Sequence, residues 1–444
     1  MRTSYRTLLR LTGLCCAGLL LLTACGLNND DAPEMTPTSE PPTPTPLPLS
    51  QVTPQPESEV VPDVGEGRTL IIWWPDQLPV DAVLEEQIQE FVAAENGTVN
   101  IDFRLKRVTD VGGIMYTLRS GLDVAPDAMP DLTLMRREDL AQAVRDELIQ
   151  PMEGSTSVSA TIIGGLYDVA LTLGQVDDRF YGLPYLLTML HYVYLPGDSL
   201  SRSADWTFDA VLARDIPFVF PAQRQTGVSE TFLLQYLVAG GDLPQPGEVM
   251  VLNPDALLTV LTFYEQALAA EIVTEAIFDY SSTLDYQNDL GDGTLPAAVV
   301  RANLYLQLRE DESAWQMAPV PTVDGEDVSL VDGWMWVMVA QSEDQQAVAV
   351  DFLNWMMALE RQRRYAEAVN RLPSQEIALR NMSRTMIDTD TADSLLRGGI
   401  PAITQSSSGV LLRAMQNALL AVVSGDATAE EATQDVISLV GAPE

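Results

Sequence analysis

The chain has 444 residues, with 25 lysines and arginines against 63 aspartates and glutamates, so its formal net charge at pH 7 is −38. Such acidity makes nucleic acid and anionic lipid poor partners, because like charges repel. Hydrophobic residues make up 46% of the chain, enough for more than one core. The only cysteines are Cys15, Cys16 and Cys25, so the rest of the sequence offers no thiol for a disulfide or a thiolate metal site.

Residues 1–24 have the pattern of an export signal. Three arginines precede an apolar run over 11–22 of about a dozen residues, whereas a membrane-spanning helix needs roughly 20. The run ends in Leu22-Thr23-Ala24-Cys25, which resembles a bacterial lipobox, where the cysteine is acylated and becomes the first residue after cleavage. We therefore predict a signal peptide over 1–24 and lipidation of Cys25, and several acyl chains there would anchor the protein stably. The alternative is an ordinary signal peptide with an incidental cysteine.

Residues 25–67 are rich in proline, threonine, serine and acidic residues. Such a segment buries too little apolar surface to offset its ordering entropy, and its prolines favour extended polyproline II conformation. We predict a disordered tether that holds a globular body away from the outer face of the cytoplasmic membrane.

The first part of the body alternates strands and helices. We expect a buried strand over 68–75, and hydrophobic periodicity predicts the elements that follow it: a helix over 82–94, a strand over 99–105, a helix through 116–120 and a strand over 130–135. Repeated strand-helix-strand units predict a parallel, doubly wound sheet with ligands beyond the carboxyl ends of its strands. The segments 73–77 and 136–138 would then lie together at the mouth of the ligand site, beyond the carboxyl ends of the strands.

The remainder repeats this style of alternation. A long apolar run covers 185–195, and Asn253 followed by Pro254 marks the start of a helix over 254–270. The other predicted elements are helices over 206–212, 230–239, 344–357, 408–424 and 429–439, and strands over 216–220, 297–300 and 332–340.

This succession resembles the extracellular solute-binding proteins of ABC importers, the large family that includes maltodextrin-binding protein. The resemblance covers about residues 68–440 and depends on the order and spacing of individually weak features. These are an opening strand that ends in tryptophan, Ser120-Gly121, Pro130-Asp131-Leu132, Phe180-Tyr181-Gly182-Leu183-Pro184, Asp205-Trp206-Thr207-Phe208-Asp209, Gly240-Gly241, Ala297-Ala298-Val299, Pro319-Val320-Pro321, Gly333-Trp334, the helix over 347–360, Arg371-Leu372-Pro373-Ser374, and Ser424-Gly425-Asp426-Ala427-Thr428 before Glu430-Glu431-Ala432.

The resemblance implies an α/β fold of two discontinuous, doubly wound lobes joined by a hinge, the type II periplasmic-binding fold. Lobe 1 would comprise 68–186 and 330–372, and lobe 2 would comprise 187–329 and 373–444. A ligand in the cleft would favour the closed arrangement. The sequence departs from the family at Tyr194-Leu195-Pro196, where Tyr-Asn is common, and at Arg301-Ala302-Asn303, which replaces a glycine-rich turn. Both departures fall near the expected cleft.

A sugar cleft needs aromatic faces for the rings of the sugar and polar groups for its hydroxyls. Strand alternation lets one of Trp73 and Trp74 face the cleft, and we favour Trp74 with Asp76 as a hydroxyl acceptor. By resemblance, Trp334 and Tyr305 occupy positions where relatives stack an aromatic ring on the solute. Each could equally pack in a core. The other predicted ligand-binding residues, which follow strand ends and could instead be solvated surface, are Arg136, Gln223 and Arg301.

Little in the sequence indicates an enzyme. The single histidine, His191, lies in an apolar run without a nucleophile elbow, so a structural role is favoured over a catalytic one. The single lysine, Lys106, is far from any glycine-rich loop, and Asp289-Leu290-Gly291-Asp292-Gly293 lacks the pattern of a calcium loop. We therefore expect no catalytic residues, no metal and no cofactor, although paired carboxylates for glycoside cleavage stay open.

These features together predict a monomeric, lipid-anchored, non-catalytic receptor that captures a small solute, a sugar or oligosaccharide, and delivers it to ABC permease subunits. The acidity and tyrosines leave open a polyamine or a metal complex as the solute. A surface hydrolase and a sensory binding protein are the alternatives from other classes.

Overall fold

The computed structural model describes residues 67–109, 111–196, 205–242, 250–309, 314–402 and 409–440. These residues belong to one unit by their contacts. The predicted signal peptide, Cys25 and the tether up to residue 66 lie outside the described residues.

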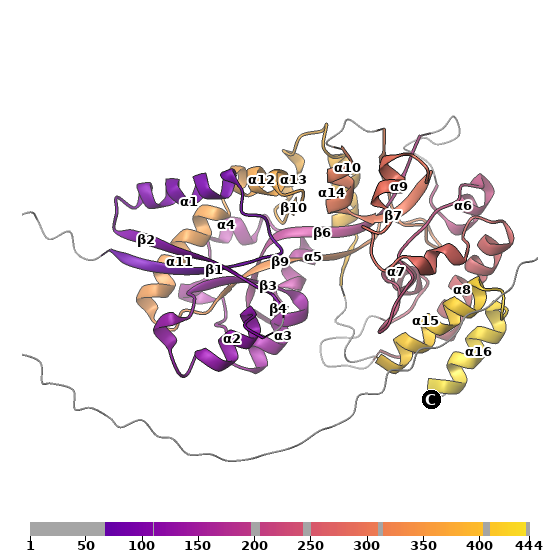
Figure 1. Cartoon of the computed structure of the whole chain (residues 1–444), viewed down its shortest axis with the longest axis horizontal. Helices are drawn as coiled ribbons and strands as arrows, with labels where there is room; N and C mark the ends of the chain where they lie inside the picture. Colours follow the sequence, from indigo (N-terminus) through magenta and orange to yellow (C-terminus); the bar gives the residue numbers. More distant parts are fainter. Residues whose placement is uncertain are drawn as a thin grey trace, which may run out of the picture. The chain divides into compact units, whose positions relative to one another are not determined.

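A nine-stranded sheet runs through the described residues, with the order β10-β6-β9-β3-β1-β2 along its main path (Figure 1). In addition, β7 and β8 pair with β6, and β11 pairs with β9. The strands are β1 (Arg68–Pro75), β2 (Val99–Lys106), β3 (Leu132–Arg136), β6 (Gly182–Tyr194), β7 (Ala297–Arg301), β8 (Gln316–Ala318), β9 (Ser329–Met338), β10 (Leu372–Pro373) and β11 (Gly399–Pro401), with β4 (Gln175–Val176) and β5 (Arg179–Phe180) as a separate pair.

The predicted α/β class is confirmed, but the sheet is mixed where we expected a parallel one. Strand β1 runs parallel to β2 and β3. Strand β9 arrives from a distant part of the chain and runs antiparallel to both β3 and β6. Local periodicity indicates that a strand exists but not its direction, so the sequence did not show that β9 is antiparallel to its neighbours.

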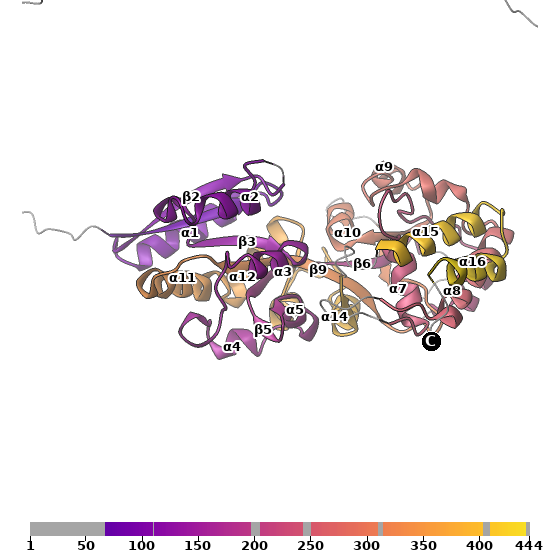
Figure 2. The same ribbon diagram turned by 90° about the horizontal axis from the view of Figure 1, so that it is seen from below.

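Helices cover the sheet on both sides of its long strands. In two views, α1 and α11 lie toward one end of β6 and β9, and α7, α8, α15 and α16 lie toward the other (Figures 1 and 2). The helices are α1 (Ala82–Ala94), α2 (Ile114–Gly121), α3 (Arg137–Arg145), α4 (Ala160–Ile163), α5 (Asp168–Leu173), α6 (Phe208–Arg214), α7 (Glu230–Val238), α8 (Pro254–Ala269), α9 (Gln287–Gly291), α10 (Ala302–Arg309), α11 (Glu343–Met356), α12 (Leu359–Ala368), α13 (Glu376–Arg380), α14 (Thr389–Arg397), α15 (Gly409–Val423) and α16 (Ala429–Val440).

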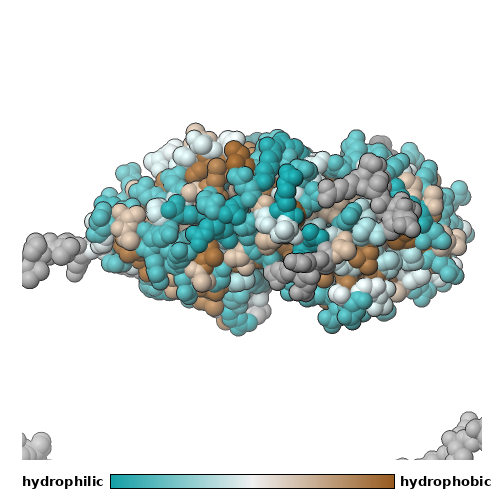
Figure 3. Space-filling model, turned by 90° about the horizontal axis from the view of Figure 1, so that it is seen from above, coloured by the Kyte–Doolittle hydropathy of each residue, from teal (hydrophilic) through white to brown (hydrophobic). Residues whose placement is uncertain are grey.

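None of the helices within the described ranges is both long enough and apolar enough to cross a bilayer. The face of the molecule in Figure 3 is largely hydrophilic, with apolar side chains in smaller patches.

Most of the predicted elements are present. The start of α8 is confirmed in detail, because the Asn253 side chain accepts hydrogen bonds from the backbone N–H groups of Asp255 and Ala256. The predicted strand over 216–220 is wrong: the structure has only an isolated bridge between Val219 and Ala298 there. Prolines at 217 and 221 lack the N–H groups that a longer ladder would need.

The long strands β6 and β9 each pass from one hydrophobic core to another. We call the cluster that contains Leu186 and Trp334 the first core, and the cluster that contains Leu190 and Leu330 the second core. A third cluster, the shared core, continues along the opposite face of the same strands. The predicted lobe boundaries, at 186/187 and 329/330, fall in β6 and β9; they stay a prediction.

The single histidine lies inside this arrangement. His191, on β6, is fully buried, and its ring meets the ring of Tyr305 edge to face, with 5.4 Å between centroids. Burial lowers the pKa of His191 to about 3, because the charged form is desolvated.

This burial predicts acid sensitivity that depends on His191. Between pH 6.5 and pH 3 the unfolded chain binds a proton that the folded chain does not, so this group lowers the free energy of unfolding as the pH falls, by about 1.4 kcal/mol per pH unit. We expect His191→Phe to remove that contribution. Denaturant unfolding from pH 7 to pH 5 should show the stability difference between variant and wild type moving in favour of the variant.

The matched control is Tyr192→Phe, the neighbouring buried residue on β6, which does not titrate in acid. Its stability difference from the wild type should stay constant over the same range. A constant difference for His191→Phe as well would contradict the assignment.

Candidate functional site

Polar side chains interrupt the buried strands where the first core gives way to the second. Leu330 of β9 belongs to the second core and Trp334 to the first, and Asp332 lies between them on the same face. On β6, Thr188 lies in the same way between Leu186 and Leu190. The two polar residues are direct partners in the β6–β9 ladder. They form the middle of a group that we call the polar junction, which consists of Thr188, Asp332, Arg136, Arg301 and Arg371.

Arg136 reaches the junction from the first-core side. It is the last residue of β3 and pairs in register with Trp334. Its guanidinium donates a hydrogen bond to the Asp332 carboxylate and lies 3.4 Å from the more exposed Glu138. Burial opposes the charged form of Arg136, but the Asp332 carboxylate more than offsets this and the pKa is raised. Asp332 is only 6% exposed, so the ion pair with Arg136 is largely shielded from solvent on the carboxylate side.

Arg301 reaches the junction from the second-core side. It ends β7 and pairs in register with Leu190. Its Nη2 atom donates to both carboxylate oxygens of Glu230, at 2.6 Å each. Glu230 opens α7, where a negative side chain also suits the positive end of the helix.

Arg371 comes from the segment just before β10. Leu372 pairs with Leu187, and both belong to the shared core. Alternation therefore places Arg371 on the opposite face of the sheet, the face of Thr188 and Asp332.

A buried network holds β10 against β6. The Gln362 amide donates to the Tyr185 carbonyl and to the Ser374 hydroxyl, at 2.9 Å each. The Ser374 hydroxyl in turn donates to the Pro184 carbonyl at 2.6 Å. These bonds fix the backbone that carries Arg371.

The close contact of β6 and β9 requires glycine at position 333. A Cβ atom there would lie 2.5 Å from the Leu186 carbonyl oxygen, a backbone atom that cannot move aside. The Gly333 N–H also donates to the Asp332 carboxylate at 2.8 Å. The next residue, Trp334, is 7% exposed and packs in the first core.

Two predicted aromatic residues are packed in cores. Trp73 and Trp74 point to opposite faces of β1 as expected, but both faces are covered, and Trp74 is 0% exposed. The Trp74 indole donates to the Leu78 carbonyl and contacts the Tyr365 ring. Tyr305 is 2% exposed, against His191. The structure thus differs from the expectation that Trp74 faces a cleft, because β1 is an interior strand.

The remaining two predicted residues, Asp76 and Gln223, are exposed. The Asp76 carboxylate accepts a hydrogen bond from the Val108 N–H at 3.3 Å. Gln223 lies in the loop before α7, where its N–H donates to the Tyr280 carbonyl. Of the seven predicted ligand-binding residues, the structure brings together Arg136, Arg301 and Trp334.

Sequence reasoning missed Asp332, Glu230 and Arg371. A signal for Asp332 was present, because it is the only charged residue in the otherwise buried strand β9. Arg371 was noticed only as part of a motif. Glu230 looked like an ordinary residue in the first turn of a helix.

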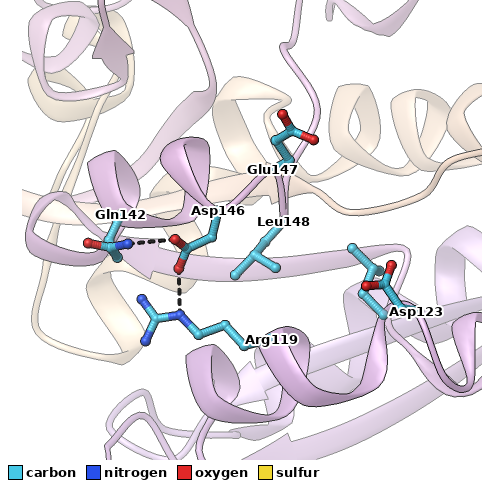
Figure 4. A pocket seen from close by; sticks show the side chains of 7 residues that line it. Arg119, Asp123, Gln142, Asp146, Glu147 and Leu148 are labelled. Atoms are coloured by element: carbon cyan, nitrogen blue, oxygen red, sulfur yellow. Dashed lines mark hydrogen bonds and ion pairs between the residues drawn. The ribbon is translucent and has the colours of Figure 1, made fainter.

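A separate hollow of about 550 Å³ lies between α2 and α3 and contains none of the predicted residues. Figure 4 shows its polar lining: the Asp146 carboxylate accepts hydrogen bonds from Arg119 at 2.5 Å and from Gln142 at 2.7 Å. These groups already satisfy one another. Across the part of the chain that the structure describes, no three histidine, cysteine or acidic side chains are grouped so as to hold a metal ion.

Comparison with known proteins identifies the family. A model described as bacterial extracellular solute-binding protein matches residues 87–382. A search of curated proteins gave no match.

Several solved structures share the fold at low sequence identity. The cyclic α-maltosyl-1,6-maltose binding protein from Arthrobacter globiformis superposes with a TM-score of 0.64 at 14% identity, covering 85% of this chain and 98% of its own. The maltose-binding protein MalE from Listeria monocytogenes, in complex with maltose, gives 0.63 at 15% identity, with coverages of 85% and 97%. A solute-binding protein from Thermotoga lettingae bound with α-D-tagatose gives 0.59 at 16% identity, with coverages of 84% and 100%.

The ion pair between Arg301 and Glu230 should make a measurable contribution to stability. Its side chains are 22% and 27% exposed, and the Arg301 Nη2 atom donates to both carboxylate oxygens. A double-mutant cycle with Arg301→Met and Glu230→Gln should give a coupling energy of about 1–2 kcal/mol in denaturant unfolding.

The control cycle uses Arg364 and Glu86, a pair of similar length whose side chains are 36% and 52% exposed. Its coupling should be smaller, because solvent screens it. Equal couplings in the two cycles would contradict a special role for the junction pair.

Proposed function

Because the chain belongs to the family of bacterial extracellular solute-binding proteins, we propose that it captures a sugar or oligosaccharide for an ABC importer. The family supports a binding protein outside the cytoplasm, and three structural neighbours carry a sugar or are described as binding one. The family and these neighbours are binding proteins and not enzymes.

The observation that carries this proposal is the position of the polar junction. Arg136 comes from a strand of the first core and Arg301 from a strand of the second, while Asp332 lies on a strand that serves both. A solute bound there would contact groups fixed to both cores. It would therefore favour the arrangement of the two lobes in which all those contacts form.

The side chains at the junction suit the chemistry of sugars. Guanidinium groups donate to hydroxyl oxygens, and the Asp332 carboxylate accepts from hydroxyl groups. Trp334, two residues from Asp332 on β9 and 7% exposed, would be the aromatic residue that packs against a sugar ring. We propose Arg136, Arg301, Asp332 and Trp334 as solute-binding residues.

The export and anchoring steps complete the proposal. The lipobox ending in Cys25 supports acylation there, and the proline-rich segment that follows would let a monomeric body reach ABC permease subunits from the membrane surface.

The alternative solutes and classes have less support. A polyamine would meet three guanidinium groups at the junction and be repelled. A surface hydrolase would need a pair of carboxylates beside the solute, whereas Asp332 and Glu230 are each engaged by an arginine. A sensory role would use the same site and differ only in the partner protein.

Sugar binding should raise stability. With the full chain, a sugar at about 100 times its dissociation constant should add about 2.7 kcal/mol to the free energy of unfolding. Thermal unfolding against a panel of neutral and acidic sugars measures this. Trp334→Ala should weaken the affinity for the active sugar about tenfold or more.

The control is Trp355→Ala on α11, a half-buried indole that contacts Arg361 and is not part of the junction. It should change stability and leave affinity unchanged. If neither variant changes the affinity of a sugar that binds, the site lies elsewhere; if no sugar stabilises the wild type, the function is wrong.

Acylation predicts where the protein is found in the cell. In a bacterial host with the lipoprotein pathway, the wild type should fractionate with membranes, and Cys25→Ser should abolish this. Cys15→Ser and Cys16→Ser, within the signal peptide, are the controls and should leave the protein on the membrane. Membrane association that persists in Cys25→Ser would refute the lipid anchor.

A further inference from the structure

We propose that the solute carries an anionic oxygen group, a carboxylate or a phosphate on a sugar, and that Arg371 binds this group together with Arg136 and Arg301. The inference rests on the proposed sugar-binding function and deepens it. The evidence is the cluster of three guanidinium groups on one face of the sheet, only two of which have a carboxylate partner among the described residues.

The three arginines share one face by strand register. Arg136 pairs with Trp334, and Arg301 pairs with Leu190, so both lie on the face that carries Thr188 and Asp332. Arg371 is assigned to the same face by its neighbour Leu372, whose side chain belongs to the shared core behind the sheet. The cluster therefore borders the gap between the first and second cores.

The partners of the three arginines differ. Arg136 is paired with Asp332, and Arg301 is paired with Glu230. Among the described residues, the structure gives the Arg371 guanidinium one hydrogen bond, to the Asn370 carbonyl at 3.1 Å, and no carboxylate within ion-pair distance. A half-buried guanidinium with five N–H donors thus has most of its bonding capacity unused.

The electrostatic surroundings of Arg371 are unfavourable without a ligand. Its pKa is lowered, first by burial; the Tyr365 side chain opposes this shift, and the positive charges of Arg136 and Arg301 add to it. Among the described residues, no aspartate or glutamate offsets the charge of Arg371. An anion at this point would remove the repulsion and form charge-assisted hydrogen bonds, which are the strongest that a guanidinium makes.

The same chemistry separates this cluster from a neutral sugar site. A hydroxyl group would use the hydrogen bonds of Arg371 but leave the repulsion among three cations in place. A carboxylate or phosphate would use these hydrogen bonds and would also offset the repulsion among the three cations. Because charge-assisted bonds are roughly twice as strong as neutral ones, discrimination against a neutral analogue should be at least about tenfold.

The test compares matched sugars that differ in one group. Isothermal titration with the full chain at fixed ionic strength would use galactose against galacturonate, glucose against glucose 6-phosphate, and galactobiose against digalacturonate. We expect an acidic member to bind at least about tenfold more tightly than its neutral partner. The pair that shows this preference identifies the group as carboxylate or phosphate.

Variants assign the preference to Arg371. Arg371→Gln should abolish the preference for acidic over neutral sugars. Arg371→Lys should keep part of that preference, because lysine retains the positive charge but lacks the two parallel N–H donors of a guanidinium. In the absence of solute, Arg371→Gln should unfold at the same temperature as the wild type or higher, because it removes repulsion. A merely structural role would instead lower that temperature. Arg364→Gln, on α12 and paired with Glu86, is the control and should keep the full preference.

Each outcome is decisive. Equal or tighter binding of the neutral members overturns this inference and leaves the sugar-binding function standing. A preference for acidic sugars that survives in Arg371→Gln also overturns it. If no sugar of either kind binds, the proposed function fails and the inference fails with it.

Discussion

The structure depends on two strands that are each shared by two hydrophobic cores. One face of β6 and β9 packs against the shared core and is mostly apolar, with His191 among its residues, whereas the other face belongs first to one core and then to the next. Between the two cores that second face carries polar residues that belong to neither core. The position of the candidate site thus follows from the packing: Thr188 and Asp332 are where they are because neither core extends over them.

The elements around these strands were largely predictable, since helices and strands carry local signals. Helix α8 is the clearest case, because its Asn253 cap and Pro254 fix its start without any tertiary contact. The short strand expected at 216–220 is absent for an equally local reason, the prolines at 217 and 221. Strand direction was not predictable, because β9 pairs with β3 and β6 across long stretches of sequence.

The site was only partly predictable, and burial explains the difference. Alternation correctly separates Trp73 from Trp74, but it cannot show that both faces of β1 are covered. Arg136 and Arg301 were found because they follow strand ends, a position that sequence patterns reveal. Arg371 depends on the pairing of β10 with β6, which involves two residues on each strand and leaves no periodic signal.

A crystal structure of the protein with a bound sugar would test the central claim most directly. Our account predicts the sugar at the polar junction, in contact with Arg136, Asp332 and Arg301, with any acidic group against Arg371. A sugar bound instead in the hollow beside Arg119 and Asp146, or elsewhere on one core, would contradict it.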